Sequence, residues 1–165
     1  AMIIAMAISA STSFAVETSG SSGLSAKPYI GTGAFIPKDD QIDIGFGATL
    51  GFEVASGKEA LFMDATFSQT GISEDILWTT GDARNTVLSL GYKREVTECG
   101  KWKLGASLQS HRMDFGNRSM SAVSVAALAE YNLFGRTSLQ FVSTQLQKKS
   151  DIRFGVFQLN IVRHF

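Results

Sequence analysis

The sequence predicts an all-β chain, folded as an eight-stranded antiparallel up-and-down transmembrane β-barrel. Three observations predict this fold class. Apolar side chains alternate with polar or small ones along most of the chain. The alternating segments are longer than strands of ordinary soluble sheets, and the connections between them alternate between short and longer ones, as they do in bacterial outer-membrane barrels.

The alternation is clearest between Asp43 and Val54. One face of this segment is apolar and the other is polar or small. In a soluble sandwich the apolar face would point to a core, whereas in a membrane barrel it points to lipid and the polar face fills the lumen. The apolar face carries Ile44, Phe46, Ala48, Leu50, Phe52 and Val54.

Strand length favours the membrane barrel over the sandwich. Most of the segments have ten residues or more, and a strand needs about 9–11 residues to cross a bilayer at its usual tilt. The predicted strands cover residues 27–36, 42–54, 59–68, 84–95, 101–112, 119–132, 136–147 and 152–165.

The connections give an independent indication. Those after the second, fourth and sixth predicted strands (55–58, 97–100 and 133–135) are short, and each contains a glycine. Those after the odd strands include the longest connection, Gln69–Ala83. Because bacterial barrels have short turns on the periplasmic side and longer loops outside, both ends of the barrel segment are expected on the periplasmic side.

Composition indicates a single folded domain with no nucleic-acid partner. The chain has 165 residues, of which 44% are hydrophobic, and its 15 basic and 15 acidic side chains cancel. Phosphate binding needs clustered excess Lys and Arg. The single cysteine, Cys99, has no partner for a disulfide and no metal-ligand spacing, and we expect no cofactor and no metal.

The first residues are interpreted as an export signal. Residues 1–15 are uncharged and apolar and end in Ser13-Phe14-Ala15, which suits signal peptidase. The positively charged start of a standard signal is missing, and a short buried helix is the alternative. We therefore expect a signal peptide at 1–15, a Gly/Ser spacer at 16–26 and the barrel at 27–165.

The last predicted strand carries a family resemblance. Phe157, Leu159, Ile161 and Phe165 share one face, Gly155 lies upstream, and Arg163 departs from the pattern by placing a cation among hydrophobes. The strand resembles the β-signal of outer-membrane proteins, and the architecture resembles the small barrels that include the OmpA transmembrane domain and the OmpX and Ail attachment proteins. The resemblance implies a porin-like barrel at the cell surface of a Gram-negative envelope, in contact with membrane lipid and lipopolysaccharide, and recognised by the barrel assembly machinery through its C-terminal strand.

The inward faces of the predicted strands collect charged residues of both signs. An eight-stranded barrel has an interior just wide enough for side chains to fill, so we expect a polar, ion-paired network that closes the lumen. Its predicted members are Asp43, Glu53, Asp64, Lys93, Lys103, His111 and Glu130, with Gln140 and Gln158 beside them.

Aromatic residues at strand ends predict an interface girdle, because Tyr, Trp and Phe concentrate where a barrel wall crosses the membrane interface. All are expected to face outward at one rim. They are Tyr29, Phe52, Tyr92, Trp102, Tyr131 and Phe165.

Two features remain as candidates for activity or contact. His111, with Ser107 on the same face and Asp114 nearby, is the only candidate for acid–base or nucleophilic work, and a weak one. In the predicted loop 69–83, Trp78, Ile76 and Leu77 form an apolar cluster of the kind that marks protein contacts.

The sequence thus indicates an integral outer-membrane barrel with a structural or surface-interaction role of the adhesion type, and we expect it not to be an enzyme. A lipid A-modifying enzyme is the alternative from another class, although the His-x-Ser pair of lipid A deacylases is absent after His111. A soluble β-barrel or sandwich that binds a ligand is a third interpretation.

Overall fold

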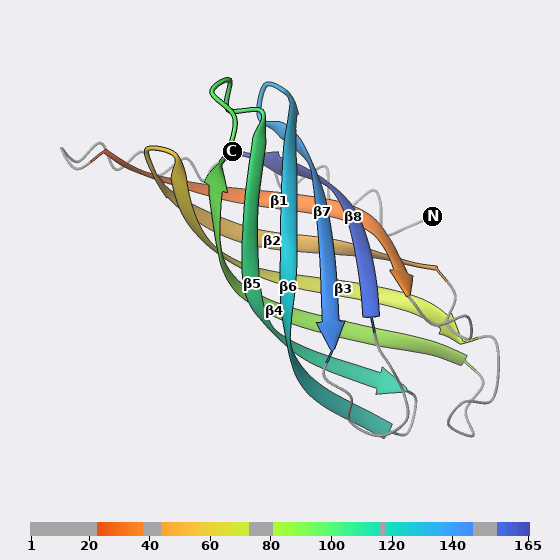
Figure 1. Ribbon diagram of the computed structural model, residues 1–165. Helices are drawn as coiled ribbons and strands as arrows, with labels where there is room; N and C mark the ends of the chain where they lie inside the picture. The colour runs from red at the N-terminus through yellow and green to blue at the C-terminus, as the bar shows by residue number, and fades with distance from the viewer. Residues whose placement is uncertain (1–22, 38–43, 73–80, 116–117, 147–154) are drawn as a thin grey trace.

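The computed structural model describes residues 23–37, 44–72, 81–115, 118–146 and 155–165. These residues form eight antiparallel strands in one closed barrel, in which each strand pairs with the next and the first pairs with the last (Figure 1). The predicted fold class is therefore confirmed. The strands are β1 (Leu24–Pro37), β2 (Gly45–Ser56), β3 (Glu59–Ile72), β4 (Gly81–Glu95), β5 (Trp102–Phe115), β6 (Arg118–Phe134), β7 (Thr137–Leu146) and β8 (Gly155–His164).

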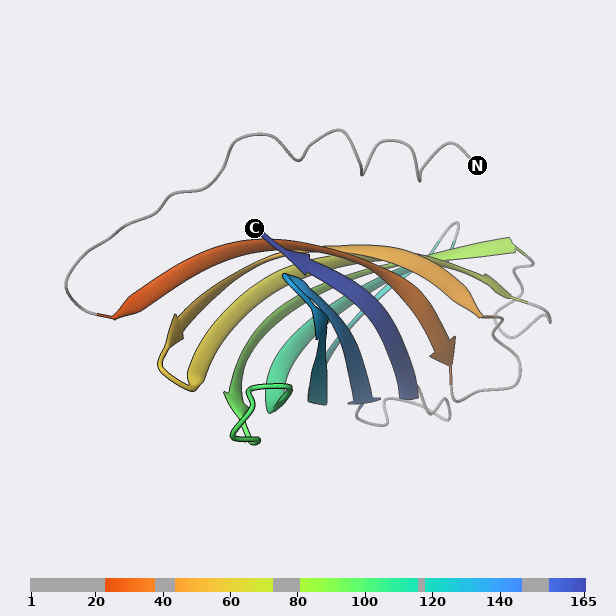
Figure 2. The same ribbon diagram turned by 90° about the horizontal axis from the view of Figure 1, so that it is seen from above.

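Three tight connections lie at one end of the barrel, which we call the turn end; the opposite end is the loop end. The turns are Gly57–Lys58, the segment from Val96 to Lys101, and Gly135–Arg136, and each contains a glycine with positive φ. The first strand starts at the turn end and the last strand finishes there, because Tyr29 pairs with His164. The strands are long and strongly curved (Figure 2), as the closure of a tilted sheet requires.

Several strand boundaries differ from the prediction by a few residues. The connection predicted at 69–83 is shorter, because β3 continues to Ile72 and β4 begins at Gly81. These ends continue the β3–β4 ladder, in which Gln69 pairs with Arg84 and Thr70 with Ala83. In the same way β1 begins at Leu24, inside the segment expected to be a spacer, because its first residues pair with the end of β2. The predicted signal at 1–15 lies outside the described residues.

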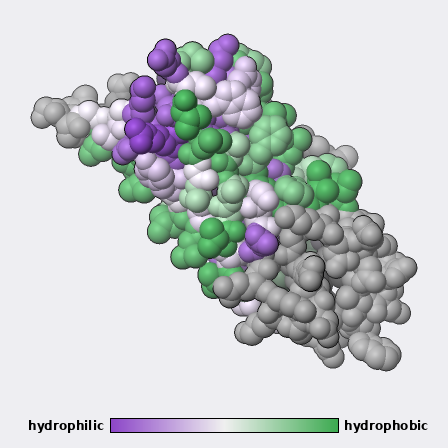
Figure 3. Space-filling model, in the orientation of Figure 1, coloured by the Kyte–Doolittle hydropathy of each residue, from purple (hydrophilic) through white to green (hydrophobic). Residues whose placement is uncertain are grey.

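The outer wall is apolar over a band whose height suits a membrane. On β6 every outward residue from Val123 to Leu133 is apolar or Tyr, and the next outward residues toward the loop end are Ser121 and Ser119. The ten steps from Val123 to Leu133 rise about 3.4 Å each along the strand, and at a tilt of about 40° they give a height of about 26 Å, close to the ~25 Å apolar band of outer-membrane barrels. Hydrophobic residues accordingly cover much of the visible wall, and hydrophilic ones gather at the turn end (Figure 3).

Many large hydrophobic side chains are exposed on this wall, among them Phe46, Leu50, Leu61, Met63, Leu90, Leu108, Val125 and Ile161. In the described part of the chain, no helix has the length and hydropathy of a membrane span.

Glycines on the inner face of the wall make room for aromatic rings. A Cβ atom on Gly51 would lie 2.2 Å from the ring of Tyr29, its register partner on β1, and one on Gly91 would lie 2.3 Å from the ring of Phe62. The narrow lumen therefore accommodates these rings only because the facing positions lack side chains.

Candidate functional site

Five side chains from five strands converge inside the barrel near the turn end. They are Glu53 on β2, Lys93 on β4, Lys103 on β5, Glu130 on β6 and His164 on β8, and we call them the lumen cluster. Each occupies an inward position close to the end of its strand that lies at the turn end, so closure of the barrel brings them together. Lys103 and Glu130 are direct register partners.

Lys93 lies at the centre of the lumen cluster. Its Nζ is 2.6 Å from Glu53 Oε2 and 2.6 Å from Glu130 Oε2, and all three side chains are almost fully buried. The ammonium also lies over the rings of Tyr29 and Phe62, at 5.9 and 5.6 Å from their centroids. Aromatic faces attract cations within about 6 Å, so Lys93 is held by two carboxylates and two rings.

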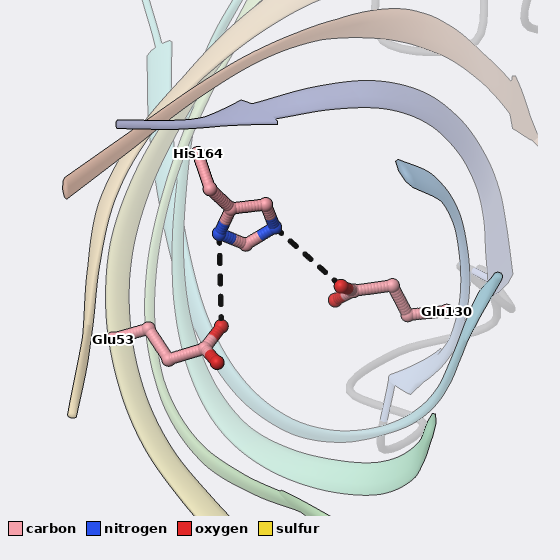
Figure 4. A group of neighbouring side chains, drawn as sticks. All are labelled: Glu53, Glu130 and His164. Carbon is pink, nitrogen blue, oxygen red and sulfur yellow. Dashed lines mark ion pairs between the residues drawn. The ribbon is translucent and has the colours of Figure 1, made fainter. Parts of the chain in front are cut away.

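Lys103 and His164 complete the cluster. Lys103 Nζ is 3.4 Å from Glu53 Oε1 and 4.0 Å from Glu130 Oε1. His164 lies between the same two carboxylates, with Nδ1 3.9 Å from Glu53 Oε2 and Nε2 3.5 Å from Glu130 Oε1 (Figure 4). Two carboxylates thus face two ammonium groups, which neutralises charges that would otherwise be costly to bury.

The arrangement of Glu53, Glu130 and His164 has the ligand types of a metal centre, with ligand atoms within 4.8 Å of one another. A divalent cation there would have to displace Lys93, whose ammonium already occupies the position between the two carboxylates at 2.6 Å from each. The geometry therefore fits an ion-pair plug better than a metal site.

A second group of polar residues lies further from the turn end. Tyr29 donates a hydrogen bond of 2.8 Å to Asp64 Oδ2, and Ser89 hydrogen-bonds to the same carboxyl group. Gln109 Nε2 donates to Ser89 Oγ at 3.4 Å, and Thr144 Oγ1 donates to Gln109 Oε1 at 2.9 Å. These contacts form one continuous chain across β1, β3, β4, β5 and β7, and the chain ends on Asp64.

His111 is buried in the lumen, where its Nε2 lies 2.8 Å from Ser124 Oγ. Among the described residues its Nδ1 has no hydrogen-bond partner. Ser107 is buried on the same strand, but Asp114 pairs with Arg112 at 3.5 Å instead of orienting the imidazole. The histidine and serine therefore lack the third member that orients the base in a nucleophilic triad.

The structure gathers the described members of the predicted lumen network inside the barrel, in separate groups. Glu53, Lys93, Lys103 and Glu130 form the lumen cluster, whereas Asp64 and His111 each have other partners. Gln140 and Gln158 are buried as well. Asp43 and the predicted contact residues Ile76, Leu77 and Trp78 lie outside the described residues.

One member of the predicted girdle has to be corrected. Phe52, Tyr92 and Trp102 are exposed on the wall, and Trp102 packs against Tyr131 with ring centroids 4.8 Å apart. Phe165 is partly exposed, and its N–H donates to the Pro28 carbonyl.

Tyr29, in contrast, points inward: it is 3% exposed and its hydroxyl donates a hydrogen bond to Asp64. Two features favour this inward position over the membrane interface. The facing residue Gly51 leaves space for the ring inside the barrel, and the hydroxyl supplies a donor to the buried carboxylate.

Sequence reasoning missed His164 as a lumen residue. Period-two alternation along β8 could have identified it, because His164 has the same parity as Gln158, Asn160 and Val162, which are all buried on the inward face.

Outside the membrane-crossing strands, the lone cysteine is exposed in the turn between β4 and β5, where a backbone hydrogen bond with Lys101 lowers the pKa of the Cys99 thiol.

No family model matches the sequence, and no curated protein matches it significantly. Several solved structures match its fold. The crystal structure of Ail, the attachment invasion locus protein of Yersinia pestis, aligns with 87% of this chain and 99% of its own, at a TM-score of 0.56 and 16% sequence identity.

Neisserial surface protein A aligns with 87% of this chain and 99% of its own (TM-score 0.52, 14% identity). The N-terminal β-barrel domain of Pseudomonas aeruginosa OprF aligns with 86% and 100% (TM-score 0.54, 9% identity). The predicted resemblance to small eight-stranded outer-membrane barrels therefore holds for the fold, and none of these proteins is matched specifically.

Proposed function

We propose that the chain is an integral outer-membrane β-barrel of a Gram-negative envelope with a surface-interaction role of the adhesion type. Two observations support the location. The fold is shared with small outer-membrane barrels, one of which, Ail, has also been studied in a phospholipid bilayer nanodisc. The apolar band on the outer wall has the height of a membrane, which disfavours a soluble binding protein. In this location the turn end faces the periplasm and the loop end faces outward.

The observation that carries the role is the filled lumen. Lys93 joins Glu53 and Glu130 across the barrel at 2.6 Å, with all three side chains almost fully buried. A barrel of eight strands has no room for a solute beside such a cluster. A protein that passes no solute acts through its outer surfaces, and the loop end is the part that meets the surroundings of the cell.

The outer wall near the loop end suggests contact with lipopolysaccharide. Beyond the apolar band the outward residues of β3–β6 become polar, and Arg84 and Arg112 are exposed on adjacent strands. They are diagonal neighbours, because Arg84 pairs with Asp114 and Thr86 pairs with Arg112. Guanidinium groups bind phosphate through paired hydrogen bonds, so both arginines suit the phosphates of the outer leaflet.

For the surface partner we propose a sulfated polysaccharide. The support is a structural relative: Ail has been solved in complex with the heparin analogue sucrose octasulfate (TM-score 0.52, 16% identity). We propose that the exposed Arg84, which directly follows the predicted contact segment 69–83, and its diagonal neighbour Arg112 supply the positive charge that sulfate groups need. Assembly in the membrane would proceed through β8, whose outward Phe157, Leu159 and Ile161 are exposed to the lipid side and suit recognition by strand addition.

The test measures the binding of cells that display the protein to immobilised heparin and to the same polymer after desulfation. We expect binding to heparin only, and loss of most of this binding in the double variant Arg84→Ser, Arg112→Ser. A matched control replaces Lys58, in a turn at the opposite end, with Ser. Equal binding to both polymers, or unchanged heparin binding in the double arginine variant, would contradict the proposed partner.

The proposed role without catalysis has its own test. Two serine–histidine pairs lie among the described residues, His111 with Ser124 at 2.8 Å and His164 with Ser138 at 3.4 Å, and none of the four lines the central cavity of the barrel. The lipid A mass spectrum of cells is therefore expected to be identical with and without the protein. A mass change that disappears in Ser124→Ala or in Ser138→Ala would instead establish a lipid A-modifying enzyme.

A further inference from the structure

Asp64 is a buried carboxylate that the ion pairs of the lumen cluster leave uncompensated. The two ammonium groups in the described lumen, on Lys93 and Lys103, make their ion pairs with Glu53 and Glu130. Among the described residues no ammonium, guanidinium or imidazole lies within ion-pair distance of Asp64. Of the three buried carboxylates, Glu53 and Glu130 thus have cationic partners and Asp64 has none, and a charge without a partner in a low-dielectric interior is costly.

The hydrogen bonds around Asp64 suit an ionised carboxylate. Tyr29 donates to it directly, and Ser89, which accepts a hydrogen bond from Gln109, is free to donate its own hydroxyl proton to Asp64. Thr144 donates to Gln109 in turn. The donors of this chain all point toward Asp64, so the surrounding dipoles favour a negative charge there.

Asp64 also lines a cavity in the centre of the barrel. The cavity has a volume of about 10 Å³, which is the size of one water molecule. Its polar lining is rich in oxygen and includes Thr49, Thr66, Gln140 and Asn160. A hydrated ion or an organic molecule is too large for this space, whereas a single desolvated cation is small enough.

A second acceptor in the lining lacks a donor. Asn160 is 2% exposed, and its Oδ1 has no hydrogen-bond partner among the described residues. The amide nitrogen of the same side chain donates to Gln140 Oε1 at 3.4 Å. Buried acceptors are normally satisfied, and no protein donor in the described residues engages this oxygen, so it is available to bind a cation in the cavity.

We propose that this cavity binds one desolvated monovalent cation of the size of Na⁺, held by the Asp64 carboxylate and the Asn160 amide oxygen. The chemistry of the lining selects this class. Oxygen ligands bind hard cations, and a calcium site would need more than one carboxylate. A single positive charge also offsets the one buried carboxylate that has no ion-pair partner, and it completes the closure of the lumen between the lumen cluster and the loop end.

The test measures the urea unfolding of the complete folded protein in phospholipid vesicles. Unfolding is followed in NaCl and in N-methyl-D-glucamine chloride at constant ionic strength, because the organic cation is too large for the cavity. We expect Na⁺ to stabilise the protein with a saturating dependence. At a Na⁺ concentration ten times the dissociation constant, the folding equilibrium constant should rise about tenfold.

Variants connect the effect to the cavity. Asp64→Asn keeps the size of the side chain and removes the charge, so its stability should no longer depend on Na⁺. Asn160→Leu should weaken the Na⁺ dependence, and Ser124→Ala, outside the cavity, should retain it. If Asp64→Asn does not fold, Na⁺ binding is measured instead by the broadening of the ²³Na magnetic resonance line. We expect the unchanged protein to broaden this line more than Asn160→Leu does.

Three results would overturn the proposal. The first is equal stability of the unchanged protein in the two salts at every concentration. The second is an undiminished Na⁺ dependence in Asp64→Asn. The third is stability that rises with falling pH while Na⁺ adds nothing and broadens no line, because a proton would then neutralise the charge.

Discussion

An arginine in place of Leu50 tests whether the outward face of the barrel lies in lipid. Leu50 is the central outward residue of β2, with 53% of its surface exposed, and its register partners are Ile30 and Ala65. A charge at this depth is as far as possible from both interfaces. Arginine at the midplane of a barrel wall costs about 2–4 kcal/mol, and near the interface it costs about 0–1 kcal/mol.

We therefore expect Leu50→Arg to lower the free energy of unfolding by about 2–4 kcal/mol, measured by urea titration in large phospholipid vesicles. The matched control is Ser121→Arg, which places the same side chain on the outward face of β6 beyond the apolar band. This variant should lose at most about 1 kcal/mol. The cost at Leu50 should also fall in vesicles of shorter lipids, because the charge then lies nearer to water.

The inward neighbour Thr49 checks the parity of the strand. It is buried and shares a hydrogen bond of 2.8 Å with Thr66. Thr49→Arg places its charge in the lumen, so its effect should not change with lipid length. Equal losses in Leu50→Arg and Ser121→Arg, or a lipid-length dependence in Thr49→Arg, would refute the assignment of the wall to the membrane.

Three further predictions concern the lumen and the last strand. Lys93→Met leaves two buried carboxylates without their shared ammonium and should cost about 3–5 kcal/mol; urea titration in vesicles measures it, and a loss below 1 kcal/mol would contradict the central position of Lys93. Tyr29→Phe removes the donor to Asp64 and should cost about 1–3 kcal/mol in the same assay, whereas an outward Tyr29 would make the change neutral. Phe165→Asp should reduce the amount of protein in outer membranes much more than it reduces refolding in detergent, as quantified by heat-modifiable migration, and equal effects in the two settings would argue against a role in assembly.

The sequence by itself determined the number of strands, their approximate positions and the direction in which most residues point. Period-two alternation decides this locally, because successive side chains of a strand face opposite sides whatever the strand pairs with. Glu53, Lys93 and Glu130 could thus be assigned to the lumen, and Leu50 to the wall, before any contact was known.

The tertiary structure decided which lumen residues meet and where Tyr29 points. Alternation predicts whether a side chain faces the lumen or the lipid, but it does not predict the position of that side chain along the barrel axis. The partners of Lys93 come from β2 and β6, 40 and 37 residues away in the chain. Only the stagger of the closed sheet sets those distances. Tyr29 turned inward because closure places it over Gly51 and beside Asp64, and the cavity between Asp64 and Asn160 exists for the same reason: its walls come from strands that have no contact until the barrel closes.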